Sequence, residues 1–591
     1  MDTQLYEQLK QQYTQLKNKE EQKQAQISTF RLLAAVIFIA FIAAAIYYST
    51  PPLLSVSAAA LLVFLLFVRM HSAVRRKIRL YQNLININEN ELTVINGGVN
   101  SYDAGERYIN RSHPFTYDLD IFGHSSLFHA VNRTGTIIGR NKLGNRFGSL
   151  GPIDIQENQS AVKELSEKVN FRQWYAAQAE MMADKEGTIE SLKNWVGRPA
   201  PIKTTYRFLF ILLPIVCCST FIAVFTIDSP IPEKLFSAFF FINLLLVGRN
   251  LKKLKEKHDL LSNISPILSM YGELLQLIEK ENVSSAYLTE LKEKLKTEKT
   301  SAAASVTALS NLLHRFDTLL NGLGSLLLNG FFLYHIHTLL SLEKWKKQFG
   351  NSITAWLEVI SEFDALNSIA NYCYNNPDFT MPVVSAEESV EIENLGHPLI
   401  AARKRICNDL RLKENKFIIL TGSNMAGKST FLRTVGINLI LARMGAPVCA
   451  TKFVFYPFDV FATMRINDSL QDNESFFYAE LKRLQQIVEH LQKGNKTFVL
   501  LDEILRGTNS NDKREGTKGF IKKMAELKTL GIIATHDLTI SQMEQEYSGY
   551  LVNKCFEVEI INDELYFDYK LKNGVCQKMS AAFLMQKMGI I

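Results

Sequence analysis

The sequence predicts a multi-domain chain, with a C-terminal α/β domain, all-α domains before it and two transmembrane helical hairpins. Two observations carry this prediction. Pairs of long, uncharged apolar runs occur twice in the N-terminal half, and a glycine-containing segment at 421–430 lies between an apolar run and a helical pattern. The length of 591 residues allows about four domains of ordinary size. With 47% hydrophobic and 21% charged residues, a disordered chain is excluded.

Charge and cysteine content narrow the possible classes of protein further. The net charge of +7 is mild for this length and does not by itself indicate a nucleic-acid-binding protein. The seven cysteines form no CxxC pair and no Cys/His ligand spacing. A disulfide framework and a structural zinc site are therefore both disfavoured.

The N-terminal segment, residues 1–28, is predicted to be a cytoplasmic amphipathic helix. Leu5, Leu9, Tyr13 and Leu16 recur at spacings of four and three, which places them on one helical stripe. The stripe is too short to predict a coiled coil.

The first transmembrane hairpin is predicted at 29–70. Its apolar runs, 32–48 and 53–68, carry no charge and flank a proline-containing turn. Each run approaches the roughly 20 residues that a helix needs to cross the hydrocarbon core. The alternative is a buried hairpin in a soluble domain, which the basic flanks disfavour. A linker is predicted to follow at 71–105.

The second transmembrane hairpin is predicted at 203–250, with apolar runs 208–227 and 235–247. The last run is short and needs its flanks to span a bilayer. Basic residues gather where each hairpin begins and ends, whereas Lys234 is the only basic residue in the two turns. By the positive-inside rule, the bulk of this multi-pass membrane protein and both its termini are cytoplasmic, and membrane lipid is a partner. The flanking residues are Lys17, Lys19, Lys23, Arg31, Arg69, Arg75, Arg76, Lys77, Arg79, Lys203, Arg207, Arg249, Lys252, Lys253 and Lys255.

A third apolar stretch, 319–340, contains Asn321, Asn329, His335 and His337. Because these polar groups are costly in lipid, the stretch is predicted to be a buried helix of a soluble domain. The two histidines are two positions apart and do not share a helix face, which disfavours a metal site.

The most informative segment is TGSNMAGKST at 421–430, which matches G-x-x-x-x-G-K-S/T. An apolar run of strand type precedes it and a helical pattern follows, as in a phosphate-binding loop. Glycines let successive backbone N–H groups point at phosphates, Lys428 reaches the β- and γ-phosphates, and the Ser429 hydroxyl binds Mg²⁺. The predicted nucleotide-binding residues are Gly422, Ser423, Asn424, Met425, Ala426, Gly427, Lys428, Ser429 and Thr430.

Two later apolar runs end in residues that fit the same chemistry. The run at 497–501 ends in Asp502 and Glu503, and the run at 531–535 ends in His536. Ligands bind at the carboxyl edge of an open α/β sheet. Asp502 is predicted to hold Mg²⁺ through water, with Ser429, and Glu503 to orient and deprotonate the attacking water. His536 is predicted to contact the γ-phosphate or the water, the alternative being a structural histidine. ATP and Mg²⁺ are therefore the predicted cofactors, with Mg-dependent ATP hydrolysis as the reaction.

These motifs resemble the ATPase domain of the MutS mismatch-repair family, itself related to ABC-type ATPases. The loop resembles the family's TGPNMGGKST, DEILRGT at 502–508 resembles DELGRGT, and ATH at 534–536 matches its ATH. The resemblance implies an ABC-like α/β P-loop ATPase domain over 385–591. One departure is Leu505, where the family has glycine.

The resemblance is weaker upstream. LDIFGHSSL at 119–127 and NRTGTIIG at 132–139 resemble the family's core motif, and FDAL at 363–366 resembles the end of its lever. The resemblance implies an all-α core and lever whose two parts, 106–200 and 251–375, are separated by the second hairpin.

The segment 467–481 resembles the family's DDLxxGRSTFMxEM, in which the serine reaches the nucleotide of the opposite subunit. Ser475 is the matching position, so the resemblance implies a homodimer through the ATPase domains. Asn473 and Glu474 replace the family's Gly-Arg.

Three hypotheses of function follow. The first is a membrane-anchored MutS-family switch that binds and hydrolyses ATP, linked by resemblance to mismatched or branched DNA. The family's Phe-x-Glu mismatch reader is not found before residue 110, and no clamp domain fits near 280–300, so DNA is a possible partner only. The second is an ATP-driven transport or remodelling machine without a DNA ligand, disfavoured by the lack of charges within the apolar runs and of an LSGGQ motif. The third is a non-catalytic scaffold, which the intact pair of Asp502 and Glu503 disfavours.

Overall fold

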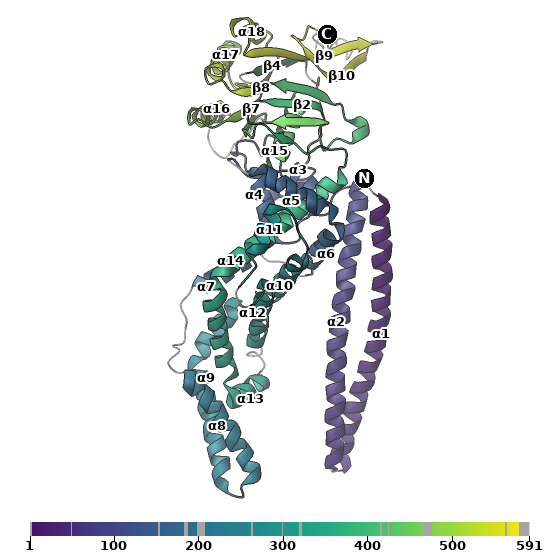
Figure 1. The fold of residues 1–591 in the computed structure, drawn as a ribbon, viewed down its shortest axis with the longest axis vertical. Coiled ribbons are helices and arrows are strands. Elements are labelled where there is room, and N and C mark those ends of the chain that lie inside the picture. Colours follow the sequence, from purple (N-terminus) through teal and green to yellow (C-terminus); the bar gives the residue numbers. More distant parts are fainter. Residues whose placement is uncertain are drawn as a thin grey trace.

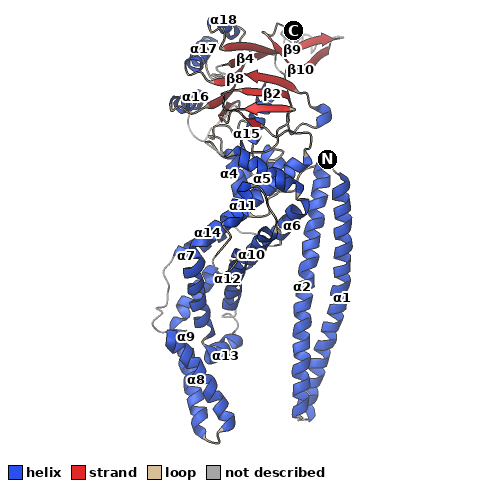
Figure 2. Cartoon of the chain, in the orientation of Figure 1, coloured by secondary structure: helices blue, strands red, loops and turns tan. Residues whose placement is uncertain are grey.

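The computed structural model is an elongated molecule (Figure 1). Strands gather at one end, helices fill the middle, and two helical legs extend to the other end (Figure 2). The described residues are 3–48, 50–151, 154–181, 187–197, 207–261, 264–297, 300–317, 322–413, 416–423, 425–465, 476–561, 564–577, 585 and 590.

The first leg is a hairpin of two long helices, α1 (Thr3–Tyr48) and α2 (Pro51–Ile95). Pro51 stands at the start of α2, where a missing N–H group and a fixed φ are tolerated. The apolar runs form the tip of the leg. Their side chains are largely exposed, as for Ile46, which is 74% exposed.

The helix boundaries in this leg differ from the predicted domains. The linker predicted at 71–105 is wrong over its first part, because α2 continues to Ile95. The helix predicted at 1–28 is not a separate element, because α1 runs without a break into the apolar run. Leu84 and Ile87 of α2 share a buried cluster with Leu9, Tyr13 and a residue of α6. This packing between helices extends α2 beyond its apolar run.

The helical middle is built from two parts of the chain that the second leg separates. The long helix α14 of the second part packs against α4 and α5 of the first. The first part holds η1 (Glu106–Tyr108), α3 (Leu127–Val131), α4 (Ile137–Gly148), α5 (Ile155–Glu167), α6 (Val169–Ala179) and α7 (Thr188–Gly197). The second part holds α10 (Ser265–Lys280), α11 (Ala286–Glu293), α12 (Ala302–Asp317) and α14 (Tyr334–Asn375).

A buried carboxylate joins these two parts. Asp364 of α14 accepts hydrogen bonds from Thr136 N at 2.9 Å and Thr136 Oγ1 at 2.6 Å, at the start of α4. Burial raises the pKa of Asp364 to about 6. The hydrogen bonds satisfy a group that would otherwise be costly to bury.

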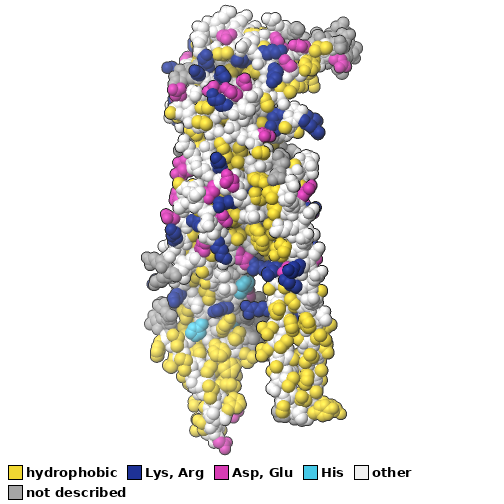
Figure 3. All heavy atoms as spheres, turned by 45° about the vertical axis from the view of Figure 1, so that its right-hand side comes forward, with side chains coloured by type: hydrophobic (Ala, Val, Ile, Leu, Met, Phe, Trp, Pro, Cys, Tyr) yellow, Lys and Arg dark blue, Asp and Glu magenta, His cyan; other side chains and the backbone are white. Residues whose placement is uncertain are grey.

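The second leg consists of α8 (Arg207–Thr226) and α9 (Pro230–Leu261). By length and composition, four helices among the described residues could cross a membrane: α1, α2, α8 and α9. Figure 3 shows hydrophobic side chains covering the ends of both legs.

The burial predicted for the helix at 319–340 is wrong over most of 322–332, whereas 319–321 lie outside the described residues. A bend of 77° at Leu333 separates α13 (Gly322–Phe332) from α14. Within α13 only Asn329 and Gly330 are buried, and Leu323 is 79% exposed. The helix packs on the second leg through Gly330, whose carbonyl accepts a hydrogen bond from Asn243 Nδ2 of α9 at 2.7 Å.

The two histidines of this stretch have structural partners. His335 Nδ1 lies 2.9 Å from Asn329 Oδ1, and His337 Nε2 lies 2.9 Å from the carbonyl oxygen of Phe210. Both contacts tie the bend to its surroundings: one to α13, the other to α8.

The C-terminal domain contains two sheets. The four-stranded sheet has the order β1-β5-β2-β3, and the six-stranded sheet has the order β10-β9-β4-β8-β7-β6. In the larger sheet all neighbouring strands are parallel except β9 and β10. The strands are β1 (Val383–Val384), β2 (Val390–Leu395), β3 (Asn408–Leu412), β4 (Phe417–Gly422), β5 (Lys452–Phe455), β6 (Asp459–Thr463), β7 (Thr497–Asp502), β8 (Leu530–Thr535), β9 (Leu551–Ile561) and β10 (Glu564–Asn573).

Helices alternate with the parallel strands, as in α/β domains. The strands β4, β7 and β8 are buried along their whole length, which explains their nearly continuous apolar sequences. The helical elements are η4 (Ala402–Lys404), α15 (Lys428–Arg443), α16 (Phe476–Gln492), α17 (Ser510–Glu526), η5 (Ile540–Gln542) and α18 (Met543–Glu546).

A second buried carboxylate holds the C-terminal domain on the helical middle. Asp118 accepts hydrogen bonds from the backbone N–H groups of Met464 and Arg465 at 2.7 and 2.8 Å. Arg483 of α16 donates to the same carboxylate at 2.5 Å. This contact connects α16 to the loop that precedes α3.

Candidate functional site

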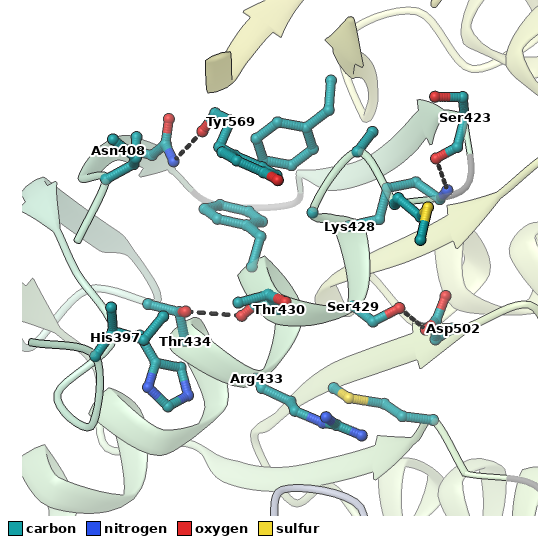
Figure 4. A pocket seen from close by; sticks show the side chains of 18 of the residues that line it. His397, Asn408, Ser423, Lys428, Ser429, Thr430, Arg433, Thr434, Asp502 and Tyr569 are labelled. Atoms are coloured by element: carbon teal, nitrogen blue, oxygen red, sulfur yellow. Dashed lines mark hydrogen bonds between the residues drawn. The ribbon is translucent and has the colours of Figure 1, made fainter. Parts of the chain in front are cut away.

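The structure describes β4 before the predicted loop and α15 after it, together with the loop residues 422–423 and 425–427. Gly427 caps α15 with φ of 100°, a left-handed conformation that favours glycine, and a Cβ there would lie 3.0 Å from the Tyr569 ring. The N-terminus of α15 faces a pocket of about 710 Å³, which its first residues line (Figure 4). Helix N-termini attract anions because of their free N–H groups and their dipole.

Lys428 points back at its own loop. Its Nζ donates hydrogen bonds to the carbonyls of Gly422 at 2.8 Å and Ser423 at 3.0 Å, and lies 3.3 Å from His536 Nε2. Burial lowers the pKa of the Lys428 ammonium. A phosphate could therefore compete for this ammonium, which holds no carboxylate within ion-pair distance among the described residues.

Ser429 and Asp502 bring two oxygen ligands together. Ser429 Oγ donates to Asp502 Oδ2 at 2.5 Å, and Asp502 ends β7 beside the loop (Figure 4). Oxygen ligands suit Mg²⁺, which usually takes one or two protein groups together with phosphates and waters. No group of three or more His, Cys, Asp or Glu side chains suited to a metal occurs in the described part of the chain. The donor set thus fits Mg²⁺ held jointly with a phosphate ligand.

Glu503 and His536 form a close hydrogen-bonded contact. Glu503 Oε1 lies 2.5 Å from His536 Nε2, and Oε2 lies 3.5 Å from Arg506 Nε. The hydrogen bond with His536 lowers the pKa of Glu503 to about 2. Glu503 also has φ of 49°, and its N–H donates to the carbonyl of Ala534 at 3.0 Å. Backbone in this region is typical of functional turns.

Glu480 of α16 is a functional candidate that the sequence reasoning missed. Its carboxylate accepts hydrogen bonds from Leu505 N at 2.6 Å and Arg506 N at 3.2 Å. Leu505 has φ of 60°, where glycine is the favoured residue, so this bracing holds a strained turn directly after Glu503. The signal available in sequence was an acid in the segment 467–481, where only Ser475 was singled out.

The far end of the pocket was also missed. Burial lowers the pKa of His397 to about 4, so its ring is neutral at pH 7. Phe431 and Tyr569 add aromatic rings to the same pocket. Asn408 Nδ2 donates to the carbonyl of Tyr569 at 3.0 Å, which fixes β10 over the loop. Aromatic walls suit a flat heterocycle.

The pocket collects most of the predicted site residues. Gly422 ends β4 below the loop, whereas Asn424 and Ser475 lie outside the described residues. The predicted residues that line the pocket are Ser423, Met425, Ala426, Gly427, Lys428, Ser429, Thr430, Asp502, Glu503 and His536. Their chemical roles stay predictions.

Comparisons with known proteins agree with this geometry. Residues 418–588 match the family model of MutS domain V. The chain is 31% identical over 225 residues to the DNA mismatch repair protein MutS of Thermotoga maritima, covering 37% of this chain and 28% of the relative. It is 32% identical over 228 residues to MutS of Listeria monocytogenes (37% and 26%). It is 28% identical over 236 residues to the human MutS protein homolog 4 (37% and 24%). In each case the match spans only 24–28% of the relative's length.

Proposed function

The C-terminal part of this chain belongs to the MutS family, and from that premise we propose that the protein is a membrane-anchored ATPase that acts as an ATP-driven conformational switch. The observation that carries the proposal is the convergence of Lys428, the Ser429–Asp502 contact and the Glu503–His536 pair on one pocket. Anion-binding, Mg²⁺-binding and water-activating groups thus lie within reach of one another.

Binding begins with the loop. The triphosphate of ATP would lie on the N-terminus of α15, and the Lys428 ammonium would exchange the carbonyls of Gly422 and Ser423 for phosphate oxygens. Ser429 and Asp502 would hold Mg²⁺, which supplies charge neutralisation at the phosphates when bound. The purine would lie between the aromatic walls, against Tyr569 and Phe431.

Hydrolysis is assigned to Glu503. Its carboxylate would orient a water toward the γ-phosphorus and accept a proton from it, as the bond from phosphorus to the bridging oxygen breaks. With its pKa near 2, the carboxylate is a weak base while His536 holds it. Its first task is therefore to position the water, and proton transfer follows when the His536 contact loosens.

The legs are proposed to cross a membrane, with the bulk of the chain and both termini in the cytoplasm. The four candidate helices expose apolar side chains toward the tips of the legs, and basic residues lie where the legs join the helical middle (Figure 3). Buried in a bilayer, this surface would lose its contact with water.

Motion would travel from the pocket to the legs through two contacts. Glu480 and Arg483 belong to the same helix, α16, so a change at the turn after Glu503 shifts the Arg483–Asp118 contact with the helical middle. Asp364 then joins that region to α14, which runs to the bend at Leu333 and the second leg. By family resemblance, two copies would close on ATP through their C-terminal domains, with Ser475 acting in trans.

DNA is the first candidate for the ligand that regulates turnover, because the relatives are named as DNA mismatch repair proteins. The second candidate function is ATP-driven transport or membrane remodelling without DNA. The two legs favour it, since they account for much of the chain outside the matched region.

The test is the steady-state ATPase rate of the detergent-purified full chain, without DNA and with matched, mismatched or branched duplex at one fixed salt concentration. We expect a basal rate of ATP hydrolysis that one form of DNA raises. Glu503→Gln should abolish this rate, whereas Glu515→Gln, on an exposed face of α17, should leave it unchanged. A basal rate that is flat across every DNA would replace the DNA-linked switch by the second candidate. If the chain shows no ATP hydrolysis that depends on Glu503, the proposed ATPase activity itself is refuted.

A further inference from the structure

A second pocket lies where the first leg meets the helical middle. It measures about 490 Å³, within the usual range of small-ligand sites. Ser72, Arg75, Arg76 and Arg79 of α2 form one wall. The opposite wall comes from the first turns of α10 and from His314 near the end of α12, and the end of α6 closes the pocket. The ATPase mechanism uses none of these residues.

The α2 wall is a charged helix face. Positions 72, 75, 76 and 79 follow the spacing i, i+3, i+4 and i+7, which places them on one side of the helix. Arg76 pairs with Glu273 of α10, which also accepts a hydrogen bond from Gln178. Arg75 and Arg79 have no carboxylate partner among the described residues. The pocket therefore holds an excess of positive charge.

The α10 wall is polar but carries no charge of its own. Pro266, Ser269 and Met270 of its first turns line the pocket, and Ser269 adds a hydroxyl group. Arginine is the residue best suited to a phosphate, because its planar guanidinium donates two parallel hydrogen bonds. The arginine wall of α2 thus favours a phosphate-bearing ligand.

The height of the pocket relative to the apolar run favours a membrane lipid as the source of that phosphate. A helix rises about 1.5 Å per residue, so Ser72 lies about 6 Å and Arg79 about 16 Å beyond Val68, the last residue of the run. The polar headgroup layer extends roughly 5–8 Å past the hydrocarbon core, which places the Ser72 end of the pocket inside the layer and Arg79 above it. Arginine side chains at such positions reach back toward the headgroups. In Figure 3, Lys and Arg side chains gather where the hydrophobic cover of the legs ends.

We propose that this pocket binds the phosphate-bearing headgroup of an anionic phospholipid, with Arg75 and Arg79 as its main contacts. The inference rests on the proposed membrane anchoring. The bound lipid would bridge α2 to α10, and so join the first leg to the part of the helical middle that carries α14. Phosphate is the shared chemistry of a lipid and a soluble phosphate ester, and the height of the pocket favours the lipid.

The experiment measures retained lipid. Full-length chain is incorporated into nanodiscs of phosphatidylcholine with a minor share of phosphatidylglycerol, re-extracted in mild detergent, and its bound lipid is quantified by mass spectrometry. We expect phosphatidylglycerol to be enriched on the wild-type chain, and the double variant Arg75→Gln/Arg79→Gln to lose roughly tenfold of that enrichment. The matched control is Arg69→Gln/Lys77→Gln, which removes the same charge from exposed positions of α2 outside the pocket.

The possible results distinguish lipid binding by the pocket from membrane anchoring of the chain. Equal enrichment in both double variants would refute lipid binding by this pocket, because the enrichment would then follow from the general positive charge of the surface. Displacement of the lipid by soluble glycerol phosphate at matched concentration would replace the lipid by a free phosphate ester as the ligand. Carbonate extraction of the cell membranes tests anchoring separately: release of the chain would overturn the membrane proposal, whereas a retained chain without phosphatidylglycerol enrichment would overturn this inference alone.

Discussion

The pairing of Glu503 with His536 sets the charge state of the candidate active site. Because the folded pKa of Glu503 is lowered from 4.5 to about 2, its pairing stabilises the fold fully above pH 4.5. That stabilisation is lost as the pH falls through about 2. Across the neutral range, Glu503 is therefore ionised and able to accept a proton or orient a water.

Replacing His536 tests this assignment. In His536→Ala, Glu503 loses the hydrogen bond that lowers its pKa most, so that pKa rises toward its ordinary value. We expect the ATPase rate to fall about a hundredfold, because the carboxylate loses the contact that positions it, and the acid limb of the pH–rate profile to move to higher pH. The profile is measured from pH 4 to 9, within the range in which the chain stays folded. His124→Ala, which removes an exposed ring paired with Glu106, serves as the control. An unchanged profile would contradict the role of His536.

At the scale of elements, Glu480 connects α16 to the turn after β7. In Glu480→Gln, the amide keeps one acceptor oxygen, so one of the N–H groups of Leu505 and Arg506 loses its partner. We expect a loss of kcat of roughly tenfold, about the worth of one hydrogen bond, with KM for ATP unchanged because Glu480 does not line the pocket. Steady-state kinetics measure both constants.

The control for this variant is Glu489→Gln, on the same helix. The carboxylate of Glu489 is hydrogen-bonded only to Gln485 among the described residues. A rise in KM without a fall in kcat would show that Glu480 acts on nucleotide binding and not on the position of Glu503.

The packing of α4 on α14 depends on one glycine. A Cβ at Gly139 would lie 2.4 Å from Asp364 Cβ, so Gly139→Ala must push the two helices apart. We expect a loss of about 1–3 kcal/mol of unfolding free energy, measured by thermal unfolding of the detergent-solubilised chain. In Gly519→Ala, on α17, nothing lies within 4 Å of the new Cβ, and a gain of about 0.5–1 kcal/mol is expected. Equal shifts in both variants would refute the proposed contact.

At the scale of the whole molecule, the two legs place two turns at one end and the C-terminal domain at the other (Figure 1). If the legs cross a membrane, Thr50→Cys and Lys234→Cys lie outside the cell and Ser301→Cys lies inside. We expect a membrane-impermeant maleimide to label the first two in intact cells, and the third only after permeabilisation. The unsubstituted chain, with its seven cysteines, sets the background. Labelling of all three before permeabilisation, in cells that exclude a soluble cytoplasmic marker, would contradict this topology.

Several features of this protein were readable from single segments. The glycine loop, the acids that end β7 and the histidine that ends β8 each follow a buried strand, and parallel strands bring their carboxyl ends to one edge. The apolar runs were equally local, because a membrane-type helix is defined by its own composition. Such signals need no knowledge of what packs against them.

The remaining features depend on contacts between segments far apart in sequence. Glu480 matters because it meets Leu505, α2 continues past its apolar run because it packs on α6, and α13 turns onto the second leg because Gly330 fits against Phe240. The sequence by itself thus determined the chemistry of the loop and the positions of the apolar helices. Only the tertiary structure decided which groups brace Glu503 and where a charged helix face forms a pocket, because burial and charge pairing arise only when distant segments meet.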